Sequence, residues 1–181
     1  MCGILGTIPS TNENEFKNAL NKLEHRGPDG YGIETIENNI TLGHRRLAIV
    51  DLSNNGHQPM YDKSKRYCIV LNGEIYNFLE IKKELKEKGY IFHSLSDTEV
   101  LLYSYIEWGE KCVLKFNGMW ALAIWDNQKK ELFLSKDRFG KKPLFYAIVD
   151  NKLIFASEMK AIYPFLKEIK PFIGFPVKPS Q

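Results

Sequence analysis

The sequence predicts an α+β protein, in which antiparallel sheets are covered by helices on their outer faces. Segments with helical and with strand-like apolar periodicity are grouped along the chain and do not alternate as strand-helix-strand units. Turn-forming pairs, Asn38-Asn39, Asp126-Asn127 and Asp150-Asn151, separate successive strand candidates, as in β-hairpins. Grouped strands joined by short turns are typical of antiparallel sheets with helices stacked outside them.

Size and composition are those of one domain of ordinary length. The chain has 181 residues, of which 44% are hydrophobic and 13% aromatic, enough to bury a sizeable core. No internal repeat, low-complexity tract or interdomain linker is visible in the sequence. We therefore expect one folded unit over residues 1–170, followed by an irregular, proline-rich tail over 171–181.

Periodicity and capping residues place the individual elements. Ser10 and Glu13 have the spacing of a capping box at the start of the first helix. Helices are expected at 12–24, 77–89 and 96–109, with a short one after 158. Strands are expected at the N-terminus and at 31–37, 40–44, 68–71, 119–125, 132–136, 144–149 and 152–156.

Charge and cysteine content exclude several classes of partner. The net charge is +3, and the lysines of the second predicted helix alternate with glutamates, so we expect a solvated helix face and no nucleic-acid partner. No stretch approaches the roughly 18 apolar residues of a membrane span, and the N-terminus lacks a signal peptide, so no membrane partner is expected. The three cysteines form no Cys-x-x-Cys pair, which indicates a reducing, cytoplasmic location. These features do not predict the oligomeric state.

The opening residues carry a candidate nucleophile. Removal of Met1 would leave Cys2 with a thiol and a free α-amine on one residue. A thiol with a pKa near 8.5 and an amine with a pKa of roughly 7.7–8.0 both titrate close to neutral pH, so the amine can act as the base for the thiol. The alternative for this residue alone is a small packed cysteine without a catalytic role. If Met1 is retained, Cys2 has no free amine and we expect no activity.

Four further polar segments have both a structural and a functional interpretation. Asn72-Gly73 follows a short apolar strand, where an amide side chain and a backbone N–H can form an oxyanion hole, or the pair can form a hairpin turn. Because a helix follows the pair, the hairpin is the less favoured of the two. The loop 25–30 is either functional or a turn fixed by an Arg-Asp pair. Arg46 is a carboxylate-binding fork or a surface arginine, and the helix dipole alone would explain Asp97.

Eight motifs occur in a fixed order along the chain. They are Met1–Ile4, His25–Gly30, Gly43–Asp51, Leu71–Asn77, Ser96–Glu99, Gly118–Ala121, Asp137–Gly140 and Ser157–Lys160. Together they closely resemble the glutaminase domain of asparagine synthetases and related class II glutamine amidotransferases, over positions 1 to about 165. The resemblance implies a fold of the N-terminal nucleophile hydrolase type, a four-layer αββα sandwich of two antiparallel sheets between helices.

The resemblance also implies a catalytic set. Cys2, after loss of Met1, matches the nucleophile that attacks the side-chain amide of glutamine, with its own α-amine as the general base. Asn72 and the backbone N–H of Gly73 match the oxyanion hole. The products are glutamate and ammonia, formed through a thioester on Cys2, and neither a metal nor an organic cofactor is expected.

A second set implied by the resemblance binds the amino-acid head of glutamine. Arg46 matches the clamp on the α-carboxylate, helped by backbone groups of Ile49 and Val50. Glu74 and Asp97 match the carboxylates that hold the α-ammonium. This assignment is chemically coherent because a zwitterion needs one cation and one or two anions.

Two features depart from the family pattern. Asparagine synthetases continue into an ATP-binding domain with a Ser-Gly-Gly-x-Asp loop, and this sequence ends at Gln181 without one. We therefore expect a separate or missing ATP-dependent synthetase domain as the partner that receives ammonia, and the final acceptor stays open. The alternative is a catalytically silent module that binds glutamine or a partner. A metal site built from Cys2 and the histidines at 25, 44 and 57 is not expected, because their spacing matches no common ligand pattern.

Overall fold

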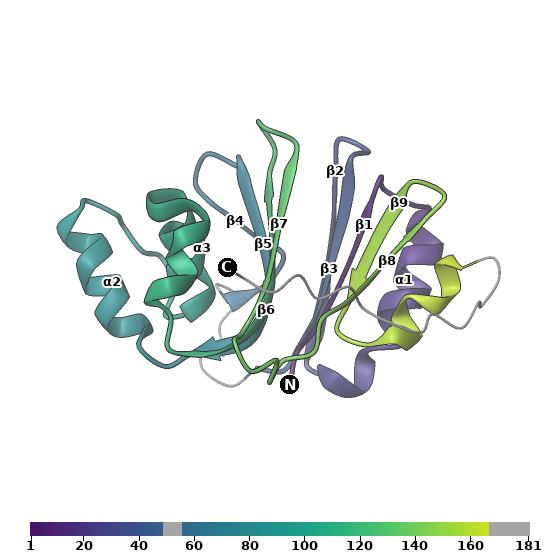
Figure 1. The fold of residues 1–181 in the computed structure, drawn as a ribbon, viewed down its shortest axis with the longest axis horizontal. Helices are drawn as coiled ribbons and strands as arrows, with labels where there is room; N and C mark the ends of the chain where they lie inside the picture. Colours follow the sequence, from purple (N-terminus) through teal and green to yellow (C-terminus); the bar gives the residue numbers. More distant parts are fainter. Residues whose placement is uncertain (49–55, 167–181) are drawn as a thin grey trace.

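Two antiparallel sheets stack face to face in the computed structural model, with helices on both outer sides (Figure 1). The structure describes residues 1–48 and 56–166. The predicted tail, 171–181, and two predicted substrate-binding residues, Ile49 and Val50, lie outside these ranges. The predicted α+β class with helix, sheet, sheet and helix layers is confirmed.

The first sheet has the strand order β2-β3-β1-β9-β8 and is antiparallel throughout. β1 (Gly3–Ile8) lies at its centre, between β3 (Ile40–Arg46) and β9 (Lys152–Ala156). The two edges are β2 (Gly30–Ile36) and β8 (Phe145–Val149). The residue that precedes β1 therefore lies at one end of the central strand of this sheet.

The second sheet has the strand order β4-β5-β6-β7. Its strands are β4 (Met60–Tyr61), β5 (Tyr67–Ile75), β6 (Gly118–Asp126) and β7 (Glu131–Lys136). All of them pair antiparallel. The short strand β4 has no counterpart among the sequence-based predictions.

β5 is longer than the strand predicted at 68–71. It pairs with β6 along its whole length, so that Asn72 lies opposite Ala121 and Gly73 opposite Trp120. The expectation that Asn72-Gly73 ends the strand is wrong, and the hairpin alternative is wrong too. Asn and Gly have low strand propensity, but pairing with a distant strand overrides such local preferences.

The first helix, α1 (Glu13–Asn21), is shorter than the predicted 12–24, and the capping box is wrong. The Asn12 side chain caps the helix by accepting hydrogen bonds from the Asn14 N–H (3.0 Å) and the Glu15 N–H (3.3 Å). The Ser10 hydroxyl donates instead to the carbonyl of Asn38, at 2.7 Å. Asn is as good a cap as Ser, and here it is the residue next to the helix.

The other two α-helices begin and end close to where the sequence predicts. α2 (Phe78–Glu87) is followed by Gly89, whose φ of +94° permits the left-handed turn after the helix. α3 (Asp97–Trp108) is capped by the Ser96 hydroxyl, which accepts from the Thr98 N–H at 3.1 Å. Short 3-10 helices complete the described structure at η1 (Glu24–Arg26), η3 (Gly109–Lys115), η4 (Met159–Ala161) and η5 (Tyr163–Phe165). The last two are the short helix predicted after 158.

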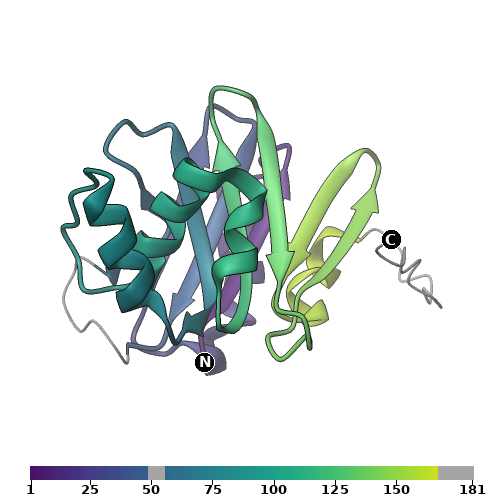
Figure 2. The same cartoon turned by 60° about the vertical axis from the view of Figure 1, so that its left-hand side comes forward.

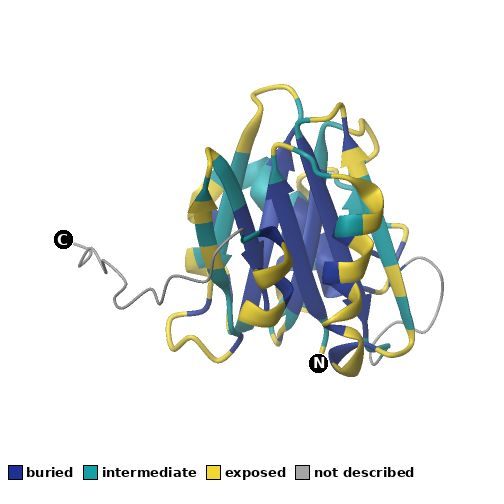
Figure 3. Ribbon diagram, turned by 90° about the vertical axis from the view of Figure 1, so that its right-hand side faces the viewer, coloured by how far each residue is buried: buried dark blue, intermediate teal, exposed yellow. Residues whose placement is uncertain are grey.

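Three apolar clusters hold the layers together. The cluster between the sheets contains Ile4, Val70, Trp125 and Phe155. A second cluster lies between the second sheet and helices α2 and α3, and a third lies between the first sheet, α1 and the terminal 3-10 helices. Figure 2 shows α2 and α3 in front of the second sheet. Figure 3 shows the helical layer on the first sheet, with exposed helix surfaces in front of buried strands. Within the described ranges, no helix is long and apolar enough to cross a membrane.

Candidate active site

Cys2 lies at one end of the sandwich, directly before the central strand β1. Gly3 is paired with Arg45 on β3, which brings Cys2 beside the end of that strand. The Leu47 N–H donates to the Cys2 sulfur at 3.4 Å, and the thiol is 3.7 Å from the Leu47 carbonyl. The Cys2 carbonyl accepts from Nε of Arg26 at 2.9 Å. The thiol is half-buried, so it is fixed in place and still reachable.

A pocket of about 210 Å³ opens at this sulfur. Its walls come from the residues at the start of β1, the end of β3, the second half of β5, the first turn of α3 and the loop between β7 and β8. Six of the eight predicted site residues line it: Cys2, Arg46, Asn72, Gly73, Glu74 and Asp97. The other two, at 49 and 50, lie outside the described residues. Residues far apart in the sequence are thus gathered around one thiol.

Asn72 and Gly73 meet the pocket from β5. The Asn72 side chain is 1% exposed, and neither its amide nitrogen nor its amide oxygen has a hydrogen-bond partner within the described part of the chain. A Cβ added at Gly73 would lie 2.4 Å from the Met119 carbonyl oxygen and 2.7 Å from the Cα of Trp120. Only glycine therefore fits at this register. A buried amide without a hydrogen-bond partner is uncommon in folded proteins, and a catalytic role is one of the recognised explanations for it.

Charges of opposite sign line different walls of the pocket. Arg46, at the end of β3, is 8% exposed. Asp97, in the first turn of α3, is equally buried, and its carboxylate accepts from the Ile75 N–H at 3.0 Å. Burial raises the pKa of Asp97, while the backbone N–H groups around it oppose the rise. Glu74 is exposed at the pocket rim. The pocket can therefore receive a molecule that carries both charges.

The Cys2 thiol and its nearest amine are both biased toward their neutral forms. Burial raises the pKa of the Cys2 thiol, and the Leu47 N–H and the N-terminal charge partly oppose this. Burial also lowers the pKa of the N-terminal ammonium, which Met1 carries in this chain. A neutral thiol beside a neutral amine is the state from which a proton can pass from sulfur to nitrogen.

The loop 25–30 contacts Cys2 through Arg26, which donates to the Cys2 carbonyl. Arg26 does not pair with Asp29, so that alternative is wrong: Nη1 of Arg26 lies 2.8 Å from Glu158, and the Asp29 carboxylate accepts from the Ala48 N–H at 2.8 Å. His25 and Lys160 also bind the Glu158 carboxylate, each at 3.0 Å. Burial opposes it, but these three partners hold the pKa of Glu158 at about 2. The carboxylate is ionised and anchors Arg26 against the Cys2 carbonyl.

Several pocket residues escaped the sequence-based prediction. His44, on β3, is buried, and burial lowers its pKa to about 3, so the imidazole is neutral at pH 7. The Gln58 amide lies between the Leu71 N–H (2.6 Å) and the Thr98 hydroxyl (3.1 Å). Lys142 is 6% exposed and belongs to the charged loop after β7. For His44 the available signal was membership of Gly43–Asp51, and for Lys142 it was closeness to Asp137–Gly140, whereas Gln58 belongs to none of the eight motifs. Over residues 1–48 and 56–166, no three metal-ligating side chains gather closely enough to hold a metal ion.

Comparison with known proteins agrees with this geometry. The family model described as glutamine amidotransferase domain matches residues 1–171. "Asparagine synthetase [glutamine-hydrolyzing] 3" of Bacillus subtilis is 42% identical over 175 residues, which cover 90% of this chain and 27% of the relative. "Asparagine synthetase [glutamine-hydrolyzing] 1" of the same organism is 39% identical over 169 residues, 90% of this chain and 26% of the relative. The chain thus spans about a quarter of these relatives' length.

A solved structure supports the fold. Glutamine phosphoribosylpyrophosphate amidotransferase from B. subtilis, complexed with ADP and GMP, superposes with a TM-score of 0.75 at 22% identity, over 90% of this chain and 43% of that chain. This likeness bears out the predicted sandwich of the N-terminal nucleophile hydrolase type. Since the family model covers nearly the whole sequence as well, the chain belongs to the glutamine amidotransferase domain family.

Proposed function

We propose that this chain hydrolyses the side-chain amide of glutamine to glutamate and ammonia, with Cys2 as the nucleophile. One observation supports this more than any other: a half-buried thiol and a buried amide without partners in the described structure line the same pocket. An acyl transfer at sulfur creates an oxyanion that needs donors at a fixed position. Asn72 and the Gly73 N–H would supply them.

The charged walls of the pocket suit the amino-acid head of glutamine. Arg46 would bind the α-carboxylate, together with backbone groups of Ile49 and Val50. Glu74 and Asp97 would hold the α-ammonium from the opposite wall. With both charged groups bound, the neutral side-chain amide is the part of glutamine that reaches Cys2. A substrate without an α-carboxylate or an α-ammonium is expected to bind poorly.

The reaction then proceeds in two halves. The Cys2 α-amine, freed by loss of Met1, accepts the thiol proton as sulfur attacks the amide carbon. The resulting oxyanion is stabilised by Asn72 and Gly73, and it collapses as the C–N bond breaks and the amine returns a proton to the leaving ammonia. Water then attacks the γ-glutamyl thioester on Cys2 and releases glutamate. These steps use protein groups and water only.

The ammonia acceptor is proposed from the relatives. Because they are named glutamine-hydrolysing asparagine synthetases, we infer that residues 1–170 form a glutaminase domain that supplies ammonia to an ATP-dependent synthetase domain or partner. The site chemistry does not specify the final acceptor. We place this reaction in the cytoplasm, where a reduced thiol is maintained.

The test combines intact mass with glutamate release. The purified chain is weighed before and after incubation with a diazo-ketone analogue of glutamine, and hydrolysis is followed with and without the Cys2→Ala substitution. We expect loss of Met1, one adduct at Cys2 that excess glutamine prevents, and no glutamate from the variant. A chain that lacks Met1 but takes up no label and releases no glutamate would instead be a silent binding module.

A further inference from the structure

The loop between β7 and β8 is folded around one carboxylate. Asp137 accepts backbone N–H groups of Trp120 (3.3 Å), Phe139 (3.1 Å), Lys141 (2.9 Å) and Lys142 (3.0 Å). Burial opposes it, but these N–H groups lower the pKa of Asp137, so the carboxylate is ionised. The loop therefore has one defined shape and is attached to β6 at Trp120.

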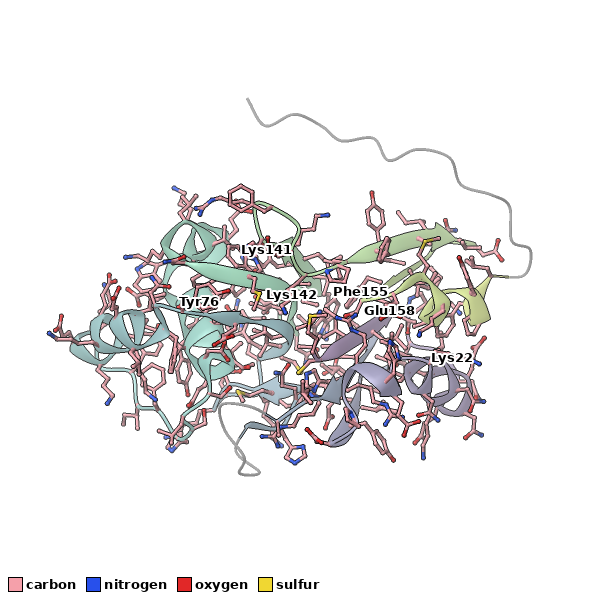
Figure 4. The ribbon with its side chains drawn as sticks, turned by 90° about the horizontal axis from the view of Figure 1, so that it is seen from below. Lys22, Tyr76, Lys141, Lys142, Phe155 and Glu158 are labelled. Atoms are coloured by element: carbon pink, nitrogen blue, oxygen red, sulfur yellow. The ribbon has the colours of Figure 1, made fainter. Side chains whose placement is uncertain are left out.

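That attachment places the loop next to the proposed oxyanion hole. Trp120 lies opposite Gly73 in the β5–β6 register. The loop that follows Asp137 turns at Gly140, whose φ is +63°. Two residues later, Lys142 lines the same pocket as Cys2. Figure 4 shows this end of the sandwich, with Lys142 and Glu158 near its centre.

Lys142 differs sharply from its neighbours in the loop. Arg138 and Lys141 are exposed, as expected for loop cations, whereas Lys142 is 6% exposed. None of the ion pairs between described residues includes Lys142. Burying an ammonium without a close counter-ion costs stability. A buried charge that costs stability and lines a pocket is a candidate for a functional residue.

We propose that Lys142 is a positioning residue of this site, whose ammonium stabilises the negative charge that the Cys2 sulfur acquires on losing its proton and keeps the neighbouring α-amine in the neutral form. The inference rests on the proposed function, because it gives the charge a role in activating the nucleophile. It assigns a task to the Asp137–Gly140 motif, which otherwise contributes no group to the reaction.

The charges around Lys142 are consistent with this role. Burial and then the neighbouring Arg26 lower the pKa of Lys142, whereas Cys2, Glu74 and Asp137 raise it. The Lys142 charge in turn contributes to the lowered pKa of the N-terminal ammonium, after burial and Arg26. A positive charge within a few Å favours a thiolate and disfavours an ammonium.

Arg46 is a second cation of the pocket, and glutamine would change its effect on the thiol. Arg46 lowers the pKa of Cys2, against the larger effect of burial and the opposing charge of Asp97. In the proposed complex, the α-carboxylate of glutamine neutralises Arg46, and the α-ammonium neutralises Glu74. Lys142, which forms no ion pair with a described residue, keeps its positive charge in the pocket at the moment when sulfur must carry negative charge.

The experiment measures the ionisation of the thiol separately from hydrolysis. Alkylation of the Met1-processed protein by iodoacetamide is followed by intact mass across pH 5–10, for wild type, Lys142→Met, Lys142→Arg and the neighbouring control Lys141→Met. Cys68 and Cys112 are buried and serve as slow internal references. We expect Lys142→Met to raise the midpoint of Cys2 alkylation by about one pH unit. The arginine variant and the control should keep the wild-type midpoint.

Hydrolysis of glutamine provides the second readout. We expect Lys142→Met to lower kcat about tenfold with little change in KM, in a chain whose Tm is not reduced. An unchanged alkylation midpoint in Lys142→Met, or an equal shift in Lys141→Met, would overturn the proposal. A raised KM with an unchanged midpoint would also overturn it and assign Lys142 to carboxylate binding. If the methionine variant fails to fold, Lys142→Gln decides the question. Since alkylation needs no turnover, a midpoint shift without glutamate release would refute only the proposed function.

Discussion

The two ends of the β5–β6 strand pair differ in whether their buried polar side chains are hydrogen-bonded. At one end, the Asp126 carboxylate is 3% exposed and accepts from Nε and Nη2 of Arg66 (3.0 and 2.7 Å) and from the N–H groups of Gln128 and Lys129 (2.9 and 3.1 Å). Toward the other end, Asn72 is equally buried, and its amide has no partner within the described part of the chain.

This difference separates stability from function on the same two strands. A buried polar group that is fully hydrogen-bonded contributes to folding, whereas an unpaired one costs roughly 1–3 kcal/mol. The sandwich tolerates that cost at Asn72 because apolar clusters pack against both sides of the second sheet. Substitutions at the two ends should therefore change different quantities, and three predictions test that.

The largest effect is expected at Asn72. Asn72→Leu removes the unpaired amide while keeping the volume of the side chain, so glutamine hydrolysis should fall about 10²–10³-fold. The Tm should stay equal or rise, because no buried hydrogen bond is lost. Activity assays and thermal unfolding of the purified variant measure both quantities. Retained activity would remove Asn72 from the proposed oxyanion hole.

Asn77 offers the matched control for that substitution. Its side chain is satisfied: the amide donates to the Lys115 carbonyl at 2.9 Å and accepts from the Asn117 N–H at 2.9 Å. Asn77→Leu should therefore lower the Tm and leave hydrolysis within about twofold of wild type. If both leucine variants changed the same quantity, the contrast between paired and unpaired amides would fail.

The second effect is on stability alone, at the opposite end of the strands. Hydrogen bonds from Arg66 lower the pKa of Asp126 to about 2, below the unfolded value of roughly 3.9. A depressed pKa contributes stability above the unfolded value, and this is lost as pH falls through the folded value. Because a third of the Arg66 side chain is exposed, we expect Asp126→Asn to cost about 1–2 kcal/mol at pH 7.

Urea unfolding at several pH values checks this prediction. The difference in unfolding free energy between wild type and Asp126→Asn should be full at pH 7 and shrink between about pH 4 and pH 2. Glu158 has a similarly low pKa, so the wild type alone will lose stability over the same range, and the difference between the two proteins is the informative quantity. Hydrolysis at pH 7 should be unchanged. Equal stability at pH 7 would show that the Arg66 pair contributes nothing.

The parts of the fold set by local sequence were predictable. Ser96 caps α3 and Gly89 ends α2, because capping depends on residues within one turn. The extension of β5 through Asn72 and Gly73 was not predictable, since it depends on pairing with a strand more than forty residues away. Local propensity favoured a turn at that point, and tertiary pairing overrode it.

The residues of the candidate site also include some that the sequence could identify and some that it could not. The motifs around Cys2 and Asn72 could each be matched to the family pattern from the sequence, because each is a short stretch with its own chemistry. Lys142 could not be distinguished from Lys141 by sequence, since both are lysines in one charged loop and only the fold buries one of them. The bond between Arg26 and Glu158 joins residues 132 positions apart and has no local pattern.

The smallest effect is expected where a satisfied group lies near the pocket. Glu158 is fully paired like Asp126, but through Arg26 it supports the Cys2 carbonyl. Glu158→Gln keeps the shape and one acceptor oxygen and removes the charge, so Arg26 should hold Cys2 less firmly. We expect kcat to fall about threefold to tenfold, because small displacements of a nucleophile are costly, with KM unchanged. The Tm should decrease only slightly.

Glu24→Gln is the control for this last substitution. It removes the same charge from a neighbouring segment. Among the described residues, the Glu24 carboxylate has only a loose ion pair with Arg45 (3.8 Å), and its side chain is 67% exposed. Comparing kcat of the two variants should therefore distinguish a loss of the support that Arg26 gives Cys2 from a general change in surface charge. If both lower kcat equally, Glu158 acts through the electrostatic field. If neither does, Arg26 holds Cys2 without help, and Glu158 belongs with Asp126 among the groups that serve stability alone.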